Sequence, residues 1–150
     1  MNSVFDTTKP IALGADHAGF EYKEAIKLWL TNKGFTVKDF GTHSIESVDY
    51  PDFAHPTAAS VESGECAFGI LFCGSANGVA ITANKHQHIR AGLAWQNDVA
   101  KLIRQHNNAN IVCIPARFIA LALVEEIIEN FMTTAFEGGR HSRRVDKIAC

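Results

Sequence analysis

The sequence predicts an α/β fold, a Rossmann-like three-layer α/β/α sandwich in which a five-stranded parallel sheet lies between two layers of helices. Three observations predict it. Short apolar runs alternate with helical patterns along the whole chain, and no repeat or low-complexity tract interrupts them. The 150 residues are 47% hydrophobic, which is enough for the core of a single domain. Strands that alternate with helices also require right-handed crossovers, which produce parallel sheets with helices on both faces.

The first half of the chain contains two predicted strands and two predicted helices. Apolar residues recur at helical intervals over 20–30, and Asn32-Lys33-Gly34 closes this helix because glycine can adopt the positive φ of a C-cap. Pro51 and Pro56 are compatible with a helix that starts near Asp52, since the first-turn amides of a helix need no intrahelical acceptor. The strands are expected at 10–14 and 35–40, and the second helix ends at Ser63-Gly64.

The second half continues the alternation. An apolar run at 67–72 is typical of a buried parallel strand, and a long amphipathic helix at 118–136 closes the core. Between them we expect a helix at 79–85, a strand at 89–94, a helix at 97–106 and a strand at 111–114. Residues 1–9 form an N-terminal extension and residues 137–150 a basic C-terminal tail.

Composition excludes several classes of partner. The net charge of −2 provides no overall basic field, so nucleic acid and anionic membranes are poor partners. No run of about eighteen apolar residues occurs, and the N-terminal segment lacks the basic and apolar parts of a signal peptide. The sequence therefore predicts a cytoplasmic protein in which any anion binding comes from local groups.

The cysteines indicate free thiols rather than disulfides. They show neither CxxC spacing nor the density of a disulfide-rich secreted domain, and they are Cys66, Cys73, Cys113 and Cys150. The pair in His86-Gln87-His88 could join a distant cysteine in a zinc site, but an HxH pair alone is a weak signal. Solvated loop histidines and no metal site are the favoured interpretation.

Cys73 stands where the apolar run meets the loop Gly74-Ser75-Ala76-Asn77-Gly78, ahead of a helix. The first amides of a helix lack intrahelical partners and carry the positive end of its dipole, so this segment forms a cradle for an anion. The same field is expected to lower the pKa of Cys73 and to favour carbanion chemistry. Alternatively, Cys73 is a small hydrophobe and the loop an ordinary turn. The loop lacks the Walker and GxGxxG patterns, which disfavours nucleotide binding.

Polar residues follow three of the predicted strands and are expected at one crevice. Asp16 and His17 follow the first strand, Cys73 the third and Arg117 the last, and ligands bind outside the carboxyl ends of such strands. His106 instead ends a helix, which topology directs toward the opposite edge of the sheet. It either caps that helix or completes the site of a neighbouring subunit across a two-fold interface.

The basic tail offers a second set of anion ligands. Arg140 and Arg144 lie on one helical face if the tail is helical, and guanidinium pairs at that spacing bind phosphate well. Gly138-Gly139 would let the tail swing over a crevice. A solvated basic face is the alternative explanation.

Five ordered sequence blocks resemble those of the type B ribose-5-phosphate isomerases, within the wider family that includes the galactose-6-phosphate isomerase subunits. The resemblance runs from about residue 10 to the C-terminus, and five blocks in order are far more specific than any one of them. The blocks are Gly14-Ala15-Asp16-His17-Ala18-Gly19-Phe20, Asp49-Tyr50-Pro51, 69–84 with Cys73, Arg104-Gln105-His106-Asn107, and Glu137-Gly138-Gly139-Arg140-His141 with Arg144.

This resemblance implies an aldose–ketose isomerase, without cofactor or metal, that interconverts ribose 5-phosphate and ribulose 5-phosphate through a cis-enediolate. It also implies a homodimer or homotetramer whose active site is shared across the interface. Cys73 would be the base that moves the proton between C1 and C2, and Ser75 would shuttle protons on the adjacent oxygens. Asp16 and His106, the latter from the partner subunit, would assist ring opening.

The resemblance further implies two sets of substrate ligands. The enediolate and the sugar would be held by the amides of the loop and by polar side chains, namely Gly74, Ala76, Asn77, Gly78, Asp49, Tyr50 and Asn107. The phosphate would be bound by His17, Arg117, Arg140 and Arg144.

Ala76 and Asn77 depart from the family pattern, because many relatives have glycine at the first position and an apolar residue at the second. Alanine tolerates positive φ poorly, at a cost of about 1 kcal/mol, so the loop is expected to take a somewhat different path. The departure leaves open a six-carbon substrate, such as allose 6-phosphate or galactose 6-phosphate, and a non-catalytic phosphosugar-binding module. A flavodoxin-like electron carrier is a more distant alternative.

Overall fold

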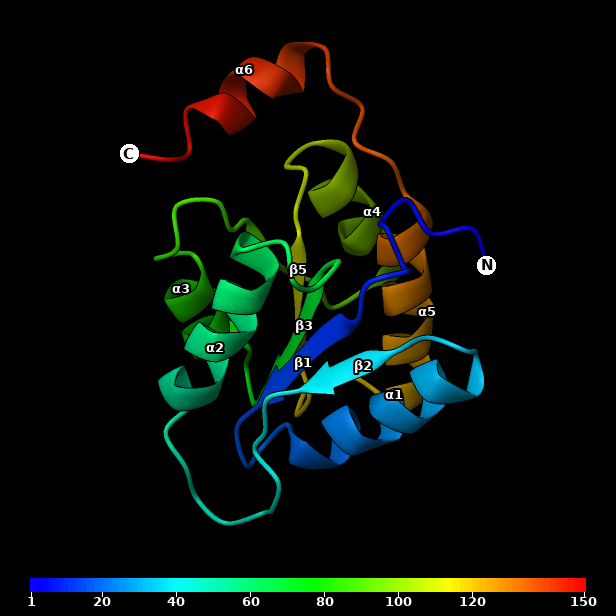
Figure 1. Ribbon diagram of the computed structural model, residues 1–150, viewed down its shortest axis with the longest axis vertical. Helices are drawn as coiled ribbons and strands as arrows, with labels where there is room; N and C mark the ends of the chain where they lie inside the picture. Colours follow the sequence, from blue (N-terminus) through cyan, green and yellow to red (C-terminus); the bar gives the residue numbers. More distant parts are fainter.

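Five parallel strands form one sheet in the order β2-β1-β3-β5-β4 (Figure 1), in a computed structural model that describes residues 1–150. The strands are β1 (Ile11–Ala15), β2 (Val37–Asp39), β3 (Gly69–Cys73), β4 (Ala91–Leu93) and β5 (Ile111–Pro115). Every neighbouring pair is parallel, as the alternation of strands with helices requires. The predicted five-stranded α/β sandwich is therefore confirmed.

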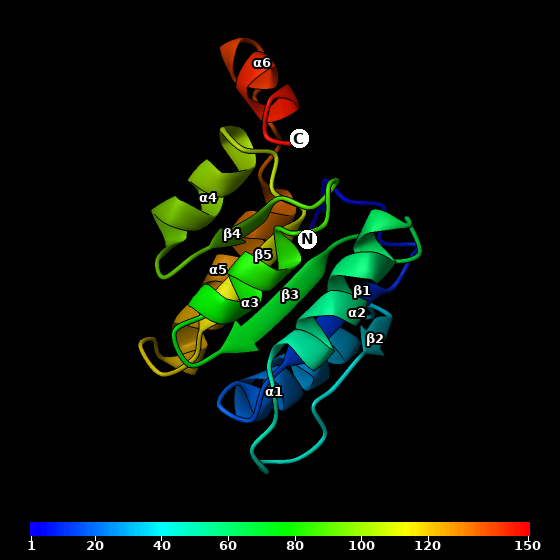
Figure 2. The same cartoon turned by 90° about the vertical axis from the view of Figure 1, so that its left-hand side faces the viewer.

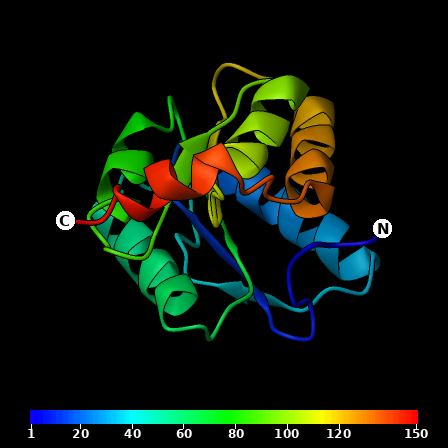
Figure 3. The ribbon, with the colours of Figure 1, turned by 90° about the horizontal axis from the view of Figure 1, so that it is seen from above.

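Five helices cover the two faces of the sheet, and a sixth stands apart (Figures 2 and 3). One face carries α1 (Phe20–Asn32), α4 (Asn97–Gln105) and α5 (Leu121–Thr133), and the other carries α2 (Pro51–Glu62) and α3 (Asn77–Ala83). The sixth helix, α6 (Arg140–Asp146), lies beyond the amino ends of the strands (Figure 1). None of the six combines the length and the apolar character that a crossing of a lipid bilayer demands.

The central strands β1, β3 and β5 are buried along their whole length, and their side chains alternate between the two helical layers. In β3, Phe72 packs into the core on the side of α1, α4 and α5, whereas Leu71 and Cys73 pack into the core on the side of α2 and α3. The side chain of Cys73 consequently faces the layer that contains α3.

The winding of the sheet reverses between β1 and β3. From β1 the chain passes through α1 to β2 at one edge, and from β3 it proceeds to β4 and β5 on the other side. Such a reversal opens a crevice outside the carboxyl ends of the two strands. The register pairs Ala15 with Phe72, so the next residues, Asp16 and Cys73, lie side by side at this point.

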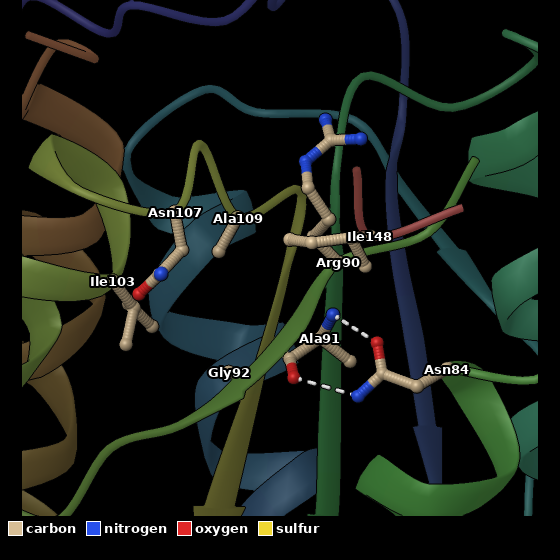
Figure 4. Close-up of a pocket in the computed structure, with 8 residues that line it drawn as sticks. All are labelled: Asn84, Arg90, Ala91, Gly92, Ile103, Asn107, Ala109 and Ile148. Carbon is tan, nitrogen blue, oxygen red and sulfur yellow. Dashed lines mark hydrogen bonds between the residues drawn. The ribbon is translucent and has the colours of Figure 1, made fainter. Parts of the chain in front are cut away.

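The outer edge of β4 is covered by a side chain. The Asn84 amide nitrogen donates to the Ala91 carbonyl at 2.9 Å, and the Ala91 N–H donates to the Asn84 side-chain oxygen at 2.8 Å (Figure 4). Asn84 therefore occupies both backbone groups through which another strand would pair with Ala91. The two residues also line a pocket together with Arg90, Gly92, Ile103, Asn107, Ala109 and Ile148.

The last core helix differs most from its expected limits of 118–136, since α5 spans only Leu121–Thr133. At its start the Phe118 N–H donates to the Pro115 carbonyl in a turn, and at its end Thr134 has an extended backbone. Beyond that point the Glu137 N–H donates to the Gln105 carbonyl at 3.1 Å, which draws the chain toward α4. The other predicted elements are present, with ends displaced by one or two residues.

Candidate active site

Asp16 and Cys73 form the centre of the site. The Cys73 Sγ donates a hydrogen bond to Asp16 Oδ2 at 3.1 Å, and the Gly19 N–H donates to Asp16 Oδ1 at 3.0 Å. Both side chains are largely buried, with Asp16 6% and Cys73 8% exposed, so only a small part of the sulfur faces the crevice. The carboxylate is thus held on one side by the backbone and on the other by the thiol.

The loop after Cys73 directs backbone amides toward the sulfur. The backbone N–H groups of Gly74 and Ala76 favour the thiolate and lower the pKa of Cys73, and Ala76 adopts a left-handed conformation with φ of 64° before α3 begins at Asn77. The positive φ expected to be unfavourable for alanine is therefore present. This conformation turns successive amides toward the same point, as an anion-binding nest requires.

The expectation of a lowered pKa for Cys73 is wrong for this state of the protein. Burial of the thiol, followed by its hydrogen bond to Asp16 and the negative charge of that carboxylate, raises the pKa of Cys73 to about 11. The amides of Gly74 and Ala76 act in the opposite direction and do not overcome these effects. Cys73 is consequently a protonated thiol with a carboxylate already positioned to receive its proton.

The remaining loop residues are more accessible. Ser75 and Asn77 are exposed, and the Asn77 side-chain nitrogen donates to the Ser75 hydroxyl at 3.3 Å. Glycine at position 78 lets the ring of Tyr50 lie against the loop, since a Cβ there would be 2.6 Å from that ring and would displace it. Tyr50 immediately precedes α2, so the ring brings the loop before that helix against the start of α3.

His17 and Arg117 lie beside this centre. The Val48 N–H donates to His17 Nδ1 at 3.2 Å, which leaves Nε2 of the neutral ring as the N–H donor for a ligand. The Arg117 side chain packs against Gly74, and the Arg117 N–H donates to the Gly74 carbonyl at 3.1 Å. Asp49 is exposed on the loop before α2. The carboxyl end of the sheet thus gathers the predicted residues that follow β1, β3 and β5.

The other predicted residues lie at the opposite end of the sheet. His106 and Asn107 follow α4, while Arg140 and Arg144 belong to α6 (Figure 1). One pocket at this end is lined by three of the predicted residues, His106, Asn107 and Arg144. His141, Val145 and Ile148 complete its lining. A single chain therefore presents two separate groups of candidate residues and does not assemble them into one site.

A hollow beside the loop is bordered by aromatic side chains that the sequence analysis did not select. Trp95 is 49% and Phe118 74% exposed, and both line this hollow with Ser75, Asn77, Leu93, Pro115, Ile119, Ala120 and Leu123. Exposed aromatic side chains next to a candidate site commonly mark a contact surface. Trp95 was missed because it lies in an irregular segment with no periodic pattern, and Phe118 because it was assigned to the predicted helix at 118–136.

The histidines at 86 and 88 do not form the metal cluster that was considered. His86 Nε2 lies 2.9 Å from the Nδ1 of His55, and His86 Nδ1 lies 3.4 Å from Glu62, whereas the three-ligand group in the chain is formed by His106, Glu137 and His141. In the sequence, the only sign of this second group is that Glu137 and His141 are four residues apart, a spacing that places residues on one face of a helix.

The chain matches a known protein family over almost its whole length. A model of the Ribose/Galactose Isomerase family matches residues 11–148. The chain belongs to the ribose/galactose isomerase family. Among its relatives, ribose-5-phosphate isomerase B of Escherichia coli K12 is 41% identical over 140 residues, which cover 93% of this chain and 94% of that protein.

Solved structures of the family superpose closely on this one. A ribose 5-phosphate isomerase of Thermotoga maritima has a TM-score of 0.92 and 49% identity, with 94% of this chain and 97% of that chain covered. Ribose-5-phosphate isomerase B of Mycoplasma genitalium, solved with bound ribulose-5-phosphate, has a TM-score of 0.90 and 39% identity, with 95% of each chain covered. The isomerase fold of this family therefore extends over nearly the whole chain.

Proposed function

We propose that this chain interconverts ribose 5-phosphate and ribulose 5-phosphate through a cis-enediolate, with Cys73 as the base. The contact that carries the proposal is the 3.1 Å hydrogen bond from the Cys73 thiol to Asp16, below the amides of Gly74 and Ala76. Membership of the ribose/galactose isomerase family supports the reaction class. Relatives named ribose-5-phosphate isomerase match more than nine-tenths of the chain and so support the substrate.

The site contains the proton donors and acceptors that this reaction needs. Asp16 accepts the thiol proton, and the resulting thiolate removes the proton from C2 of the opened aldose and returns it to C1. The exposed hydroxyl of Ser75 carries protons between the two adjacent oxygens. A positioned general base contributes about two to four orders of magnitude in rate.

The negative charge of the enediolate is held by backbone donors of residues 74–78. One well-placed donor to such an oxyanion contributes about 3 to 4 kcal/mol to the stability of the transition state. Gly74 and Gly78 allow Arg117 and Tyr50, respectively, to lie directly against the loop, where any larger side chain would displace them. The loop therefore supplies backbone N–H donors and also forms the surface that contacts the sugar.

The complete site requires a second copy of the chain. Cys73 ends β3 at the carboxyl end of the sheet, whereas α6 lies beyond the amino ends of the strands (Figure 1). The predicted residues that belong to α6 or follow α4 are therefore on the far side of the sheet from Cys73, and they are His106, Asn107, Arg140 and Arg144. In a homodimer, or a homotetramer built from such dimers, these residues enter the crevice of the partner subunit. Trp95 and Phe118 offer the exposed apolar surface that such contact would cover.

The phosphate then lies between two subunits. His17 and Arg117 contribute from the side of Cys73, while Arg140 and Arg144 of the partner subunit contribute from α6. Opening of the sugar ring is assisted by Asp16, from the same subunit as Cys73, and by His106 of the partner subunit. Paired guanidinium groups hold a phosphate in a fixed orientation and help to exclude water from the intermediate.

A panel of five- and six-carbon aldose phosphates, assayed for ketose formation, tests this function. Ribose 5-phosphate is expected to be the best substrate, and Cys73→Ala is expected to lower its turnover by about 100-fold or more. Near wild-type turnover in Cys73→Ala would show that another group is the base. Preference for allose 6-phosphate or galactose 6-phosphate would instead assign Ala76 and Asn77 to six-carbon recognition.

Deuterium exchange distinguishes an enzyme from a binding module. An isomerase incorporates deuterium from the solvent at C1 of the ketose, and at C2 of the aldose that is re-formed, because the protonated base exchanges with water during turnover. Tight binding of every aldose phosphate in the panel without such exchange would contradict the proposed reaction.

A further inference from the structure

Three potential metal ligands meet where α6 approaches the end of α4. The ligand atoms of His106, Glu137 and His141 all lie within 4.8 Å of one another. His141 Nε2 is 3.4 Å from Glu137 Oε2, and the rings of His106 and His141 stack with their centroids 4.3 Å apart. Two imidazoles and one carboxylate are the ligand set of many three-residue zinc sites.

The distances within this cluster suit a tetrahedral ion. Ligands that are each about 2.0 to 2.2 Å from zinc lie about 3.4 Å from one another. Glu137 and His141 already have this separation. The rings of His106 and His141 are stacked with only 14° between their planes, so the two in-plane lone pairs do not yet converge. The His106 side chain therefore has to turn away from the stack, and its ligand atom has to move by about 1.4 Å at most, to become the third ligand.

The backbone around the cluster is held by hydrogen bonds from several elements. The Glu137 N–H donates to the Gln105 carbonyl at 3.1 Å, and the His141 N–H donates to the Gly138 carbonyl at 3.0 Å. Arg104, which is buried, donates to the Thr134 carbonyl at 3.1 Å and so ties the end of α4 to the chain that leaves α5. Ligands carried by anchored backbone are closer to a preorganised site than a chance group of surface side chains.

We propose that His106, Glu137 and His141 bind a divalent ion of the zinc class and that the bound ion inhibits the isomerase. Imidazole and carboxylate ligands suit zinc, cobalt and nickel, and three protein ligands leave the fourth position open. Arg144 and Asn107 line the same pocket, so water or a phosphate oxygen can complete the coordination there.

Inhibition follows because the ion would hold His106, the residue assigned to ring opening in the partner subunit. The binding itself does not depend on the proposed reaction, whereas the inhibition rests on it. Metal binding and loss of activity are therefore measured separately.

Cobalt spectroscopy on the full-length, metal-free protein tests the binding site. Addition of Co²⁺ is expected to produce the intense visible bands of a tetrahedral complex, with one ion per chain, and Zn²⁺ is expected to displace it. Glu137→Gln and His141→Asn should each lose these bands. Absence of the bands in the wild type, or their persistence in both variants, would overturn the site.

Two control variants separate this cluster from other ligands. His55→Asn removes the second close histidine pair, and Cys73→Ala removes the thiol beside Asp16. Both are expected to keep the cobalt spectrum. Loss of the bands in either control, with retention in Glu137→Gln, would place the ion elsewhere and contradict the inference.

Kinetics test the inhibition. Zinc is expected to lower turnover of the wild type at least tenfold, a chelator should restore it, and Glu137→Gln should be far less sensitive. Stoichiometric zinc binding with unchanged turnover would overturn the inhibitory role while leaving the isomerase assignment intact. If no aldose phosphate is turned over, the proposed function fails, and the cobalt titration still decides whether the ion binds.

Discussion

The Cys73 thiol donates a 3.1 Å hydrogen bond to the Asp16 carboxylate, although the two residues are 57 positions apart in the sequence. Parallel pairing of β1 with β3 places them side by side at the point where the winding of the sheet reverses. The proton of the thiol and its acceptor are thus adjacent before any substrate arrives.

The reactivity of Cys73 is expected to rise steeply with pH. Only the thiolate reacts with iodoacetamide, and a pKa of about 11 leaves the thiolate a small minority near neutral pH. The labelling rate in a Cys150→Ser background should therefore rise about tenfold for each pH unit below that pKa. Mass spectrometry of labelled peptides measures it, with Cys113, which is fully buried, as a slower internal reference.

Asp16→Asn provides the matched comparison for that measurement. The Asp16 carboxylate raises the pKa of Cys73, so its replacement by a neutral amide should lower this pKa and accelerate labelling at a given pH. Turnover should nevertheless fall, because the acceptor of the thiol proton is lost. A labelling rate that is already independent of pH near neutrality in the wild type would contradict the protonated thiol.

Mixed oligomers test whether the active site is shared between subunits. Cys73→Ala and His106→Asn should each be nearly inactive alone, because each alters every site of its own homodimer. After random exchange of subunits, about one quarter of the sites combine an intact Cys73 with an intact His106, and activity should return to about that fraction.

The control mixture combines Cys73→Ala with Asp16→Asn, whose altered residues lie in the same half of the site. It should recover no activity, since no pairing of these subunits creates an intact half. If the first mixture also remains inactive after verified exchange, the shared site is wrong. Size-exclusion chromatography and native mass spectrometry verify the exchange.

Gly19→Ala is expected to damage the site through its backbone. A Cβ at Gly19 would lie 2.5 Å from the backbone carbonyl of Phe72, the residue before Cys73, and a buried strand cannot move aside. The free energy of unfolding should fall by about 3 kcal/mol. Gly34→Ala is the matched control, because that glycine has a φ of 89° with open space around it and should cost only about 1 kcal/mol.

Urea denaturation of both glycine variants measures the difference. Equal losses of stability in Gly19→Ala and Gly34→Ala would show that steric contact with Phe72 does not set the path of the chain after β1.

Ala76 should tolerate glycine and reject valine. Its φ of 64° costs alanine about 1 kcal/mol, which glycine relieves, but glycine also loses a buried methyl group worth about 0.8 kcal/mol. The stability of Ala76→Gly should therefore lie within about 1 kcal/mol of the wild type. Ala76→Val should lose about 3 kcal/mol, because a β-branched side chain suits neither the left-handed backbone nor the packed surroundings. Equal stability of the two variants would refute this account of the loop.

The fold was predictable from the sequence because its signals are local. Apolar runs such as 67–72, and helices followed by glycine such as the one closed by Asn32-Lys33-Gly34, mark the elements directly. Right-handed crossovers then determine a parallel sheet. The limits of α5 were not predictable in the same way. Phe118 fits the helical period, yet its amide is taken by the carbonyl of Pro115 in a turn.

The protonation state of Cys73 was not predictable because it depends on a neighbour across the sheet. The loop sequence reveals the amides of Gly74 and Ala76, which lower the pKa, but not the depth of burial or the carboxylate of Asp16. The opposite location of His106 followed from topology alone. Its proximity to His141 did not, since the turn at Gly138 and Gly139 directs α6 back toward α4.

The pairing of Asn84 with Ala91 has a consequence for how copies of this protein can associate. The Asn84 side-chain amide bonds both the N–H and the carbonyl of Ala91 on the outer edge of β4. At Ala91 this edge therefore cannot form the main-chain hydrogen bonds that join strands in fibrils and in sheets that continue between subunits. On the opposite rim, β2 carries the charged side chain of Lys38, which also discourages stacking. Association through these two rims is therefore disfavoured, and the proposed dimer is expected to form through side chains on helices and loops instead.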